Sequence, residues 1–185
     1  RLRAATISGY LMQGTALEDI AVGIDCHVVR QPLGVCAAIA PFNFPAMVPM
    51  WFLPFAIVTG NTFVLKPSEQ VPLSQRLMAE LLSQCGLPAG VLNIVNGGAD
   101  VVNAICDHPG IRAVSFVGST PVARHVYQRA SHSGKRVQAL GGAKNFVVVM
   151  PDADLDRSMS VISESFYGCA GGEEIDSWAC GGVVR

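Results

Sequence analysis

Short runs that are apolar on both faces recur from residue 34 onward and predict buried β-strands. Each run is rich in Val, Ile, Leu, Phe or Ala, as strands of a parallel sheet covered on both faces require. The predicted strands are residues 34–40, 62–66, 91–95, 113–117 and 145–150. Before them, residues 17–29 alternate between apolar and polar, and we expect a hairpin arm there.

Amphipathic segments lie between these runs and predict helices. The clearest is residues 73–85, where apolar residues recur about every 3.6 positions and are expected to form one face of a helix. That face would consist of Leu73, Leu77, Met78, Leu81, Leu82 and Cys85. Gly86 and Pro88 are expected to end this helix. Shorter helices are predicted at residues 100–106, 121–130 and 155–166, the last with Asp152 and Asp154 at its start.

Alternation of strands and helices predicts an α/β fold, a Rossmann-like parallel sheet with helices on both faces. We expect an N-terminal arm over residues 1–33, an α/β domain over 34–165, and the start of a further domain over 166–185. The chain begins with Arg rather than Met and stops on an apolar run, Gly181 to Arg185. We therefore interpret it as a piece of a longer protein.

Composition and charge argue against nucleic-acid binding, membrane insertion and metal binding. The 185 residues carry a formal net charge of −1, and the basic residues are scattered, so no nucleic-acid partner is expected. The longest apolar stretch, residues 44–58, is interrupted by three prolines, so no membrane partner is expected. The six cysteines show no C-x-x-C spacing, which predicts no metal site. No signal peptide is recognisable, and we expect a reducing, cytoplasmic compartment, or the mitochondrial matrix in a eukaryote.

We expect ligand-binding residues in the loops after the predicted strands, because ligands of parallel sheets bind at the carboxyl ends of the strands. In residues 66–70, KPSEQ, Lys66 and Glu69 directly follow a strand. A lysine can hold ribose hydroxyls or phosphate, and a glutamate can accept hydrogen bonds from both ribose hydroxyls while repelling a 2′-phosphate. The alternative is a solvated turn with an ordinary glutamate at a helix start.

Two further loops are ambiguous when each is taken alone. Gly118 and Ser119 stand at a strand-to-helix junction, where a backbone can approach a pyrophosphate. The same residues fit a capped helix start with Ser119 or Thr120 as the N-cap. In residues 41–45, PFNFP, Asn43 is an amide that can donate to a developing oxyanion or cap the following helix. No G-x-G-x-x-G fingerprint follows any strand.

Taken together, these loops resemble the aldehyde dehydrogenase superfamily. The order PFNFP, KPSE, FVGS and GGAKN carries the resemblance, which extends from about residue 9 to residue 171. Within the superfamily the chain is most similar to the CoA-acylating branch that acts on methylmalonate semialdehyde. The stretches that match this branch are residues 40–69 and 135–145.

The resemblance implies a cofactor site for NAD and a role for particular residues. Matched to the family motifs, the residues lining the NAD site are Ala40, Phe42, Lys66, Glu69, Gln70, Ser119 and Gly141. Lys66 and Glu69 match the pair that holds the adenosine ribose, Ser119 lies near the pyrophosphate, and Gly141 lies near the nicotinamide. Gln70 replaces an Arg that is usual in this branch. Asn43 matches the side-chain donor of the oxyanion hole.

The resemblance also implies the acyl acceptor. In the family a cysteine thiolate attacks the aldehyde, hydride leaves to NAD, and the hydrolytic branch uses a glutamate to activate water. Leu140 stands at the position of that glutamate. Leucine cannot take a proton, so the acyl group is expected to pass to a thiol, which is CoA in this branch.

The sequence departs from the family pattern at the position of the nucleophile. The family pattern G-x-A-G-x-x-C begins well at Gly168, but Glu174 occupies the cysteine position. Cys169 comes five residues early, and Cys180 six residues late. Cys180 is the candidate nucleophile only if the intervening segment bulges, and we expect the 185-residue chain to be inactive.

The overall prediction is an NAD-dependent, CoA-acylating aldehyde dehydrogenase, present as a fragment and homo-oligomeric at full length, whose small-molecule substrate is an aldehyde. One alternative is an NAD-binding module without catalysis, which Glu174 favours. Another is a hydrolytic aldehyde dehydrogenase, which Leu140 argues against.

Overall fold

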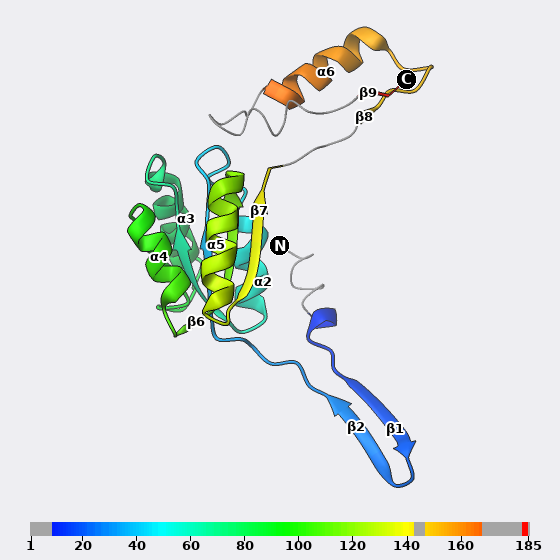
Figure 1. Cartoon of the computed structure of the whole chain (residues 1–185), viewed down its shortest axis with the longest axis vertical. Coiled ribbons are helices and arrows are strands. Elements are labelled where there is room, and N and C mark those ends of the chain that lie inside the picture. Colours follow the sequence, from blue (N-terminus) through cyan, green and yellow to red (C-terminus); the bar gives the residue numbers. More distant parts are fainter. Residues whose placement is uncertain (1–8, 143–146, 168–182, 185) are drawn as a thin grey trace.

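Five parallel strands form the central sheet (Figure 1). The computed structural model describes residues 9–142, 147–167 and 183–184. The strands of the sheet are β3 (Val35–Ile39), β4 (Thr62–Lys66), β5 (Leu92–Ile94), β6 (Ile111–Gly118) and β7 (Arg136–Gly141). They lie in the order β5-β4-β3-β6-β7, and every neighbouring pair is parallel. The predicted fold class is confirmed.

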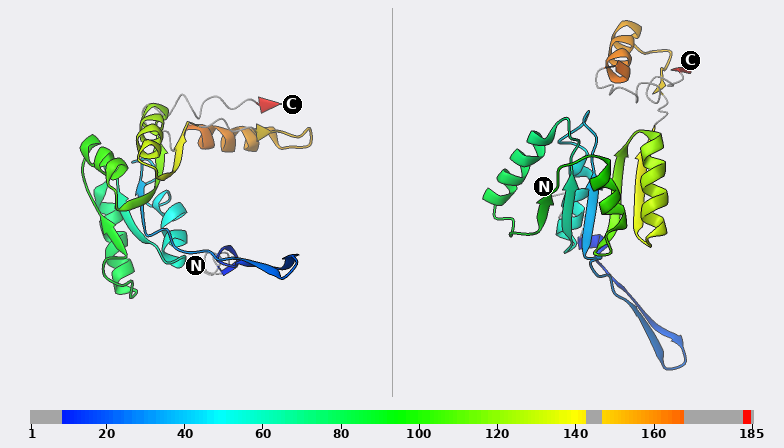
Figure 2. Two further views of the ribbon diagram at one scale, coloured as in Figure 1. Left: turned by 60° about the horizontal axis from the view of Figure 1, so that its bottom comes forward. Right: turned by 60° about the vertical axis from the view of Figure 1, so that its left-hand side comes forward.

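Helices cover both faces of this sheet (Figure 2). They are α2 (Pro49–Val58), α3 (Pro72–Gln84), α4 (Ala99–Asp107) and α5 (Thr120–His132). One buried cluster joins the sheet to α4 and α5, and a second joins its other face to α2 and α3. This arrangement is the one that right-handed β–α–β crossovers produce, with two helices on each face.

The central strand β3 shows why its sequence is apolar throughout. Ala37 and Ile39 belong to the cluster under α4 and α5, whereas Ala38 and Ala40, the residue directly after the strand, belong to the cluster under α2 and α3. All four are at most 4% exposed. Because successive side chains of a strand point to opposite faces, a strand buried on both sides has no polar position left.

A two-stranded hairpin precedes the sheet. Strands β1 (Thr15–Ala21) and β2 (Ile24–Val28) pair in antiparallel register and extend away from the sheet (Figure 1). The expected hairpin arm at residues 17–29 is thus confirmed. Its apolar side chains are largely exposed, with Leu17 at 52% and Val22 fully accessible.

The segment after the sheet differs from the prediction. Residues 145–150 were expected to supply a strand of the sheet, but the described part of them forms a short strand β8 (Val147–Val148) that pairs with β9 (Val183–Val184). The fifth strand of the sheet is instead β7. Its burial alternates, because β7 is an edge strand covered on one side, and it therefore lacks the two-faced apolar pattern. Helix α6 (Leu155–Tyr167) follows as expected, with Asp154 accepting a hydrogen bond from the Arg157 amide.

Helix α3 buries a different face from the one predicted. Leu73, Leu77 and Leu81 are 74%, 58% and 52% exposed. Met78 and Leu82 do pack against the sheet, and the fully buried residue of the helix is Gln75. Met78, Leu82 and Gln75 share the face of α3 that packs on the sheet, whereas Leu73, Leu77 and Leu81 lie on the adjoining, exposed side.

Asn61 joins the hairpin arm to the sheet. Its Oδ1 accepts hydrogen bonds from the amides of Leu33 (2.7 Å) and Gly34 (3.0 Å). Its Nδ2 donates to the Ala56 carbonyl at 3.2 Å and to Thr59 Oγ1 at 2.9 Å. Asn61 is 8% exposed, so these groups have little access to water if the side chain is removed.

We therefore expect Asn61→Ala to lower the free energy of unfolding by about 2–3 kcal/mol, because it leaves partly buried amides without an acceptor. Urea denaturation followed by circular dichroism measures this loss. Asn93→Ala is the matched control, since exposed Asn93 makes one bond of 2.8 Å to the Gly90 carbonyl. Equal losses for the two variants would contradict the role given to Asn61.

Candidate functional site

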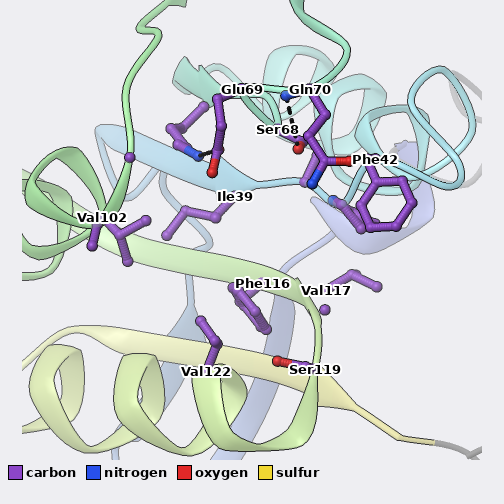
Figure 3. A pocket seen from close by; sticks show the side chains of 16 residues that line it. Ile39, Phe42, Ser68, Glu69, Gln70, Val102, Phe116, Val117, Ser119 and Val122 are labelled. Carbon is purple, nitrogen blue, oxygen red and sulfur yellow. Dashed lines mark hydrogen bonds and ion pairs between the residues drawn. The ribbon is translucent and has the colours of Figure 1, made fainter. Parts of the chain in front are cut away.

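A cavity of about 710 Å³ opens at the carboxyl ends of β3, β4 and β6 (Figure 3). The ends of these strands and the first turns of α4 and α5 form its wall. The predicted cofactor residues that line it are Ala40, Phe42, Lys66, Glu69, Gln70 and Ser119. Its volume is that of a pocket for a nucleotide-sized ligand.

Lys66 and Glu69 form an ion pair at this cavity. Lys66 is the last residue of β4 and is 4% exposed, and its Nζ donates to Glu69 Oε2 at 2.9 Å. The Glu69 side chain is 62% exposed. The hydrogen bond from Lys66 lowers the pKa of Glu69 below its ordinary value. Glu69 is therefore a carboxylate with one oxygen held by Lys66 and with access to a ligand.

The turn that carries Glu69 is fixed from within. Ser68 is buried, and its Oγ accepts a hydrogen bond from the Gln70 amide at 3.3 Å. Gln70 is exposed and reaches the cavity wall with a neutral amide. Ser68 also lines the cavity. The sequence motif contains Ser68, but nothing in its pattern distinguished a buried hydroxyl from a solvated one.

Helix α5 points its N-terminus at the cavity. Gly118 ends β6, and Ser119 follows as the N-cap residue with extended backbone (φ −62°, ψ 148°). Its side chain makes no capping hydrogen bond, and the first turn contains no acidic residue. The N–H groups and the positive end of the helix dipole are thus open to an anion. A Cβ at Gly118 would lie 2.7 Å from the Phe116 ring, so a larger residue would disturb this turn.

Helix α4 contributes a different kind of wall. Gly98, Ala99 and Val102 line the cavity from its first turn, but Asp100 in that turn disfavours an anion. Ala99 and Val102, together with Ile39, Phe116 and Val122, form an apolar side of the cavity. Sequence reasoning missed Val102 and Val122, because apolar residues in amphipathic helices are read as core.

Two predicted residues, Asn43 and Gly141, are not among those that line the cavity. Gly141 pairs with Gly118 across β7 and β6, and it does not line the cavity. A Cβ at Gly141 would lie 2.7 Å from the Ala123 Cβ and 3.0 Å from the Thr120 Cα, so its visible role is close packing of β7 against α5. Asn43 is partly buried in the segment between β3 and α2, and its Oδ1 is buried. It is not the cap of α2, whose N-cap is Val48.

The cysteines of the described residues are Cys26, Cys36, Cys85 and Cys106, and none of them lines the cavity. Burial raises the pKa of the Cys36 and Cys106 thiols, which disfavours the reactive thiolate. The nucleophile candidates Cys169 and Cys180, and Glu174, lie outside the described residues. In the described ranges no three His, Cys, Asp or Glu side chains gather in a way that could hold a metal.

None of the helices in the described part of the chain is both long and apolar enough to cross a membrane.

A sequence profile for the aldehyde dehydrogenase family matches residues 2–173. The chain belongs to this family. Among curated relatives, the malonate-semialdehyde dehydrogenase of Halalkalibacterium halodurans is 58% identical over 161 residues. That alignment covers 87% of this aldehyde dehydrogenase chain and 33% of the relative. The chain thus spans about a third of the length of the curated relatives it matches.

Solved structures show the same similarity. A Sinorhizobium meliloti protein, assigned as a methylmalonate-semialdehyde dehydrogenase and solved with NAD, has a TM-score of 0.82 and 48% identity. The match covers 90% of this aldehyde dehydrogenase chain and 34% of that protein. An Escherichia coli NADP-dependent enzyme has a TM-score of 0.81 and 36% identity, covering 92% of this chain and 36% of its own. The predicted family is therefore confirmed. These two structures are named for different dinucleotides, NAD for one and NADP for the other.

Proposed function

We propose that this chain is the NAD-binding part of an aldehyde dehydrogenase that oxidises a semialdehyde and passes the acyl group to CoA. The observation that carries the proposal is the cavity with the Lys66–Glu69 pair at one side and the uncapped N-terminus of α5 at another. The names of the relatives, malonate- and methylmalonate-semialdehyde dehydrogenase, support the substrate class.

The residues of the cavity fit the parts of NAD. The Glu69 carboxylate would accept hydrogen bonds from the adenosine ribose, while Lys66 keeps that carboxylate charged and oriented. The backbone N–H groups after Gly118 and Ser119 would hold the pyrophosphate. The apolar side formed with Val102 and Val122 suits the flat adenine ring. When bound, NAD supplies a hydride acceptor.

The same residues favour NAD over NADP. A 2′-phosphate on the ribose would approach the Glu69 carboxylate, and Lys66, the cation that lines the cavity among the described residues, is already paired with Glu69. Gln70 adds an amide rather than a positive charge. Two like charges in a partly enclosed pocket repel each other strongly. Because the fold also serves an NADP-dependent relative, this local charge pattern supports the choice of cofactor better than the fold does.

Two residues bear on the chemistry at the aldehyde. Asn43 would donate its side-chain amide to the oxyanion that forms when a thiolate attacks the carbonyl. Leu140, on edge strand β7, is 41% exposed and has no group that takes a proton. A thioester at such a site is not hydrolysed by a base from this position, which supports CoA as the acceptor. A homo-oligomer at full length remains part of the proposal.

The pH dependence of NAD binding follows from the lowered pKa of Glu69. A carboxylate whose pKa is lowered stays charged as pH falls, so the affinity is expected to be constant from about pH 8 to about pH 5 and to weaken only below that. Calorimetric titrations with NAD⁺ across this range measure the effect. A loss of affinity centred near pH 6 to 7 would contradict it, because a histidine would then be involved.

Competition for bound NADH tests the proposed cofactor site. Fluorescence anisotropy of NADH is expected to rise and saturate on titration with the chain. NAD⁺ and ADP-ribose should displace NADH at similar concentrations, whereas NADP⁺ should require a much higher concentration. Equal competition by NADP⁺ and NAD⁺ would contradict the role proposed for Glu69.

A further inference from the structure

A side chain from α3 contacts the segment that carries Phe42 and Asn43. Gln75 is completely buried on α3, and its Nε2 donates a hydrogen bond to the carbonyl oxygen of Pro45. The two residues are thirty positions apart in the sequence. Pro45 ends the motif of residues 41–45, so the bond reaches the segment close to Asn43 in the chain.

The beginning of this segment is held by a second bond. The Ala40 amide donates to the Lys66 carbonyl at 3.0 Å, at the end of β4. Residues 41–45 therefore lie between two attachment points, one on β4 and one on α3. The turn that joins β4 to α3 is also the turn that carries Glu69.

The buried glutamine is not explained by packing. Its Oε1 is buried and has no hydrogen-bond partner within the described residues. An unpaired buried amide oxygen lowers stability. Methionine has nearly the same shape and would fill the space without this cost. What glutamine supplies, and an apolar side chain lacks, is the donor to Pro45.

We propose that Gln75 is a positioning residue, which fixes residues 41–45 relative to the Lys66–Glu69 pair. Its bond to Pro45 sets the place of Phe42 in the cavity wall and of the Asn43 amide. The inference rests on the proposed function, because these positions matter only if the cavity holds a dinucleotide. A residue of this kind acts through others and need not touch the ligand.

Gln75→Met tests the inference, since it removes the donor and keeps the volume. The probe is amide hydrogen exchange at Val48, whose N–H donates to the Phe44 carbonyl at 3.2 Å in the same turn. We expect exchange at Val48 to become about tenfold faster, the factor that corresponds to one lost hydrogen bond. Exchange at Phe63, whose N–H donates to the Val91 carbonyl at 2.7 Å, should not change.

Two further readouts separate positioning from stability. The melting temperature of Gln75→Met should change little, because the cost of leaving the Pro45 carbonyl without its donor is offset by removal of the unpaired Oε1. The dissociation constant for NAD⁺ should rise about two- to tenfold, because the freed segment must be ordered on binding. Gln84→Met, at the exposed last residue of the same helix, is the matched control and should leave all three readouts unchanged.

The outcomes are distinct. Unchanged exchange at Val48 would overturn the inference, and so would faster exchange at Val48 and Phe63 together with a lower melting temperature, which indicates a packing role. If Gln75→Met does not fold, Gln75→Leu is measured in the same way, and failure of both would also overturn it. Failure of the unmodified chain to bind NAD⁺ would instead contradict the proposed function, while the exchange at Val48 still decides whether Gln75 holds the segment.

Discussion

Glu69→Ala is expected to weaken NAD⁺ binding by about ten- to a hundredfold, the range that loss of a hydrogen bond to a charged group produces. The carboxylate is exposed, lines the cavity and is kept charged by Lys66, so its loss removes the charged acceptor at this position. The same change removes the negative charge that repels a 2′-phosphate and frees Lys66 to attract it. Binding of NADP⁺ should therefore become tighter, and the preference for NAD⁺ should shrink or reverse. Calorimetric titration with each cofactor measures both effects.

Two variants sharpen this experiment. Glu69→Gln keeps an acceptor without the charge, so it should retain more NAD⁺ affinity than alanine does while still admitting NADP⁺. Glu80→Ala is the matched control, because Glu80 also pairs with a basic residue, Arg76 at 2.9 Å, but lies on the exposed side of α3 and outside the cavity. Unchanged titrations of both cofactors with Glu69→Ala would show that Glu69 is an ordinary surface residue.

The second large effect expected is the absence of turnover. Glu174 stands where the family has its cysteine, and a carboxylate does not form the thiohemiacetal that precedes hydride transfer. The purified 185-residue chain, given methylmalonate semialdehyde, NAD⁺ and CoA, should therefore produce no NADH above a protein-free blank. Absorbance at the NADH wavelength records this directly.

NADH formation in that assay would contradict the expectation and would make Cys169 and Cys180 the candidate nucleophiles to test. Cys180→Ser and Cys169→Ser are the informative pair. Loss of turnover in Cys180→Ser alone would identify Cys180 as the nucleophile, whereas loss in Cys169→Ser alone would identify Cys169. Binding of NAD⁺ with no turnover would leave the cofactor site as proposed and favour a binding module for this chain.

The parts of the site that could be read from the sequence are those made by neighbouring residues. Lys66, Glu69 and Gln70 lie in one loop, and a loop that follows a buried strand of a parallel sheet must open at its carboxyl end. Ser119 follows from the same rule. The strand pattern of β3 was equally direct, because a strand buried on both faces is apolar throughout, and β4 is apolar over its three central residues.

Residues whose roles depend on distant partners could not be read in this way. Gln75 is a polar residue in an amphipathic helix, and only the contact with Pro45 reveals that it is buried. The exposed leucines of α3 misled the assignment of its inner face for the same reason. Strand β7 was missed because an edge strand alternates, and the packing of Gly141 against α5 depends on residues of another element.

The most direct test of the account is a crystal structure of the chain grown with NAD⁺. We expect the adenosine ribose to lie within hydrogen-bond distance of the Glu69 carboxylate and the pyrophosphate to lie at the N-terminus of α5, beside Gly118 and Ser119. NAD⁺ bound with its ribose turned away from Glu69, or at another surface while this cavity contains only solvent, would contradict it.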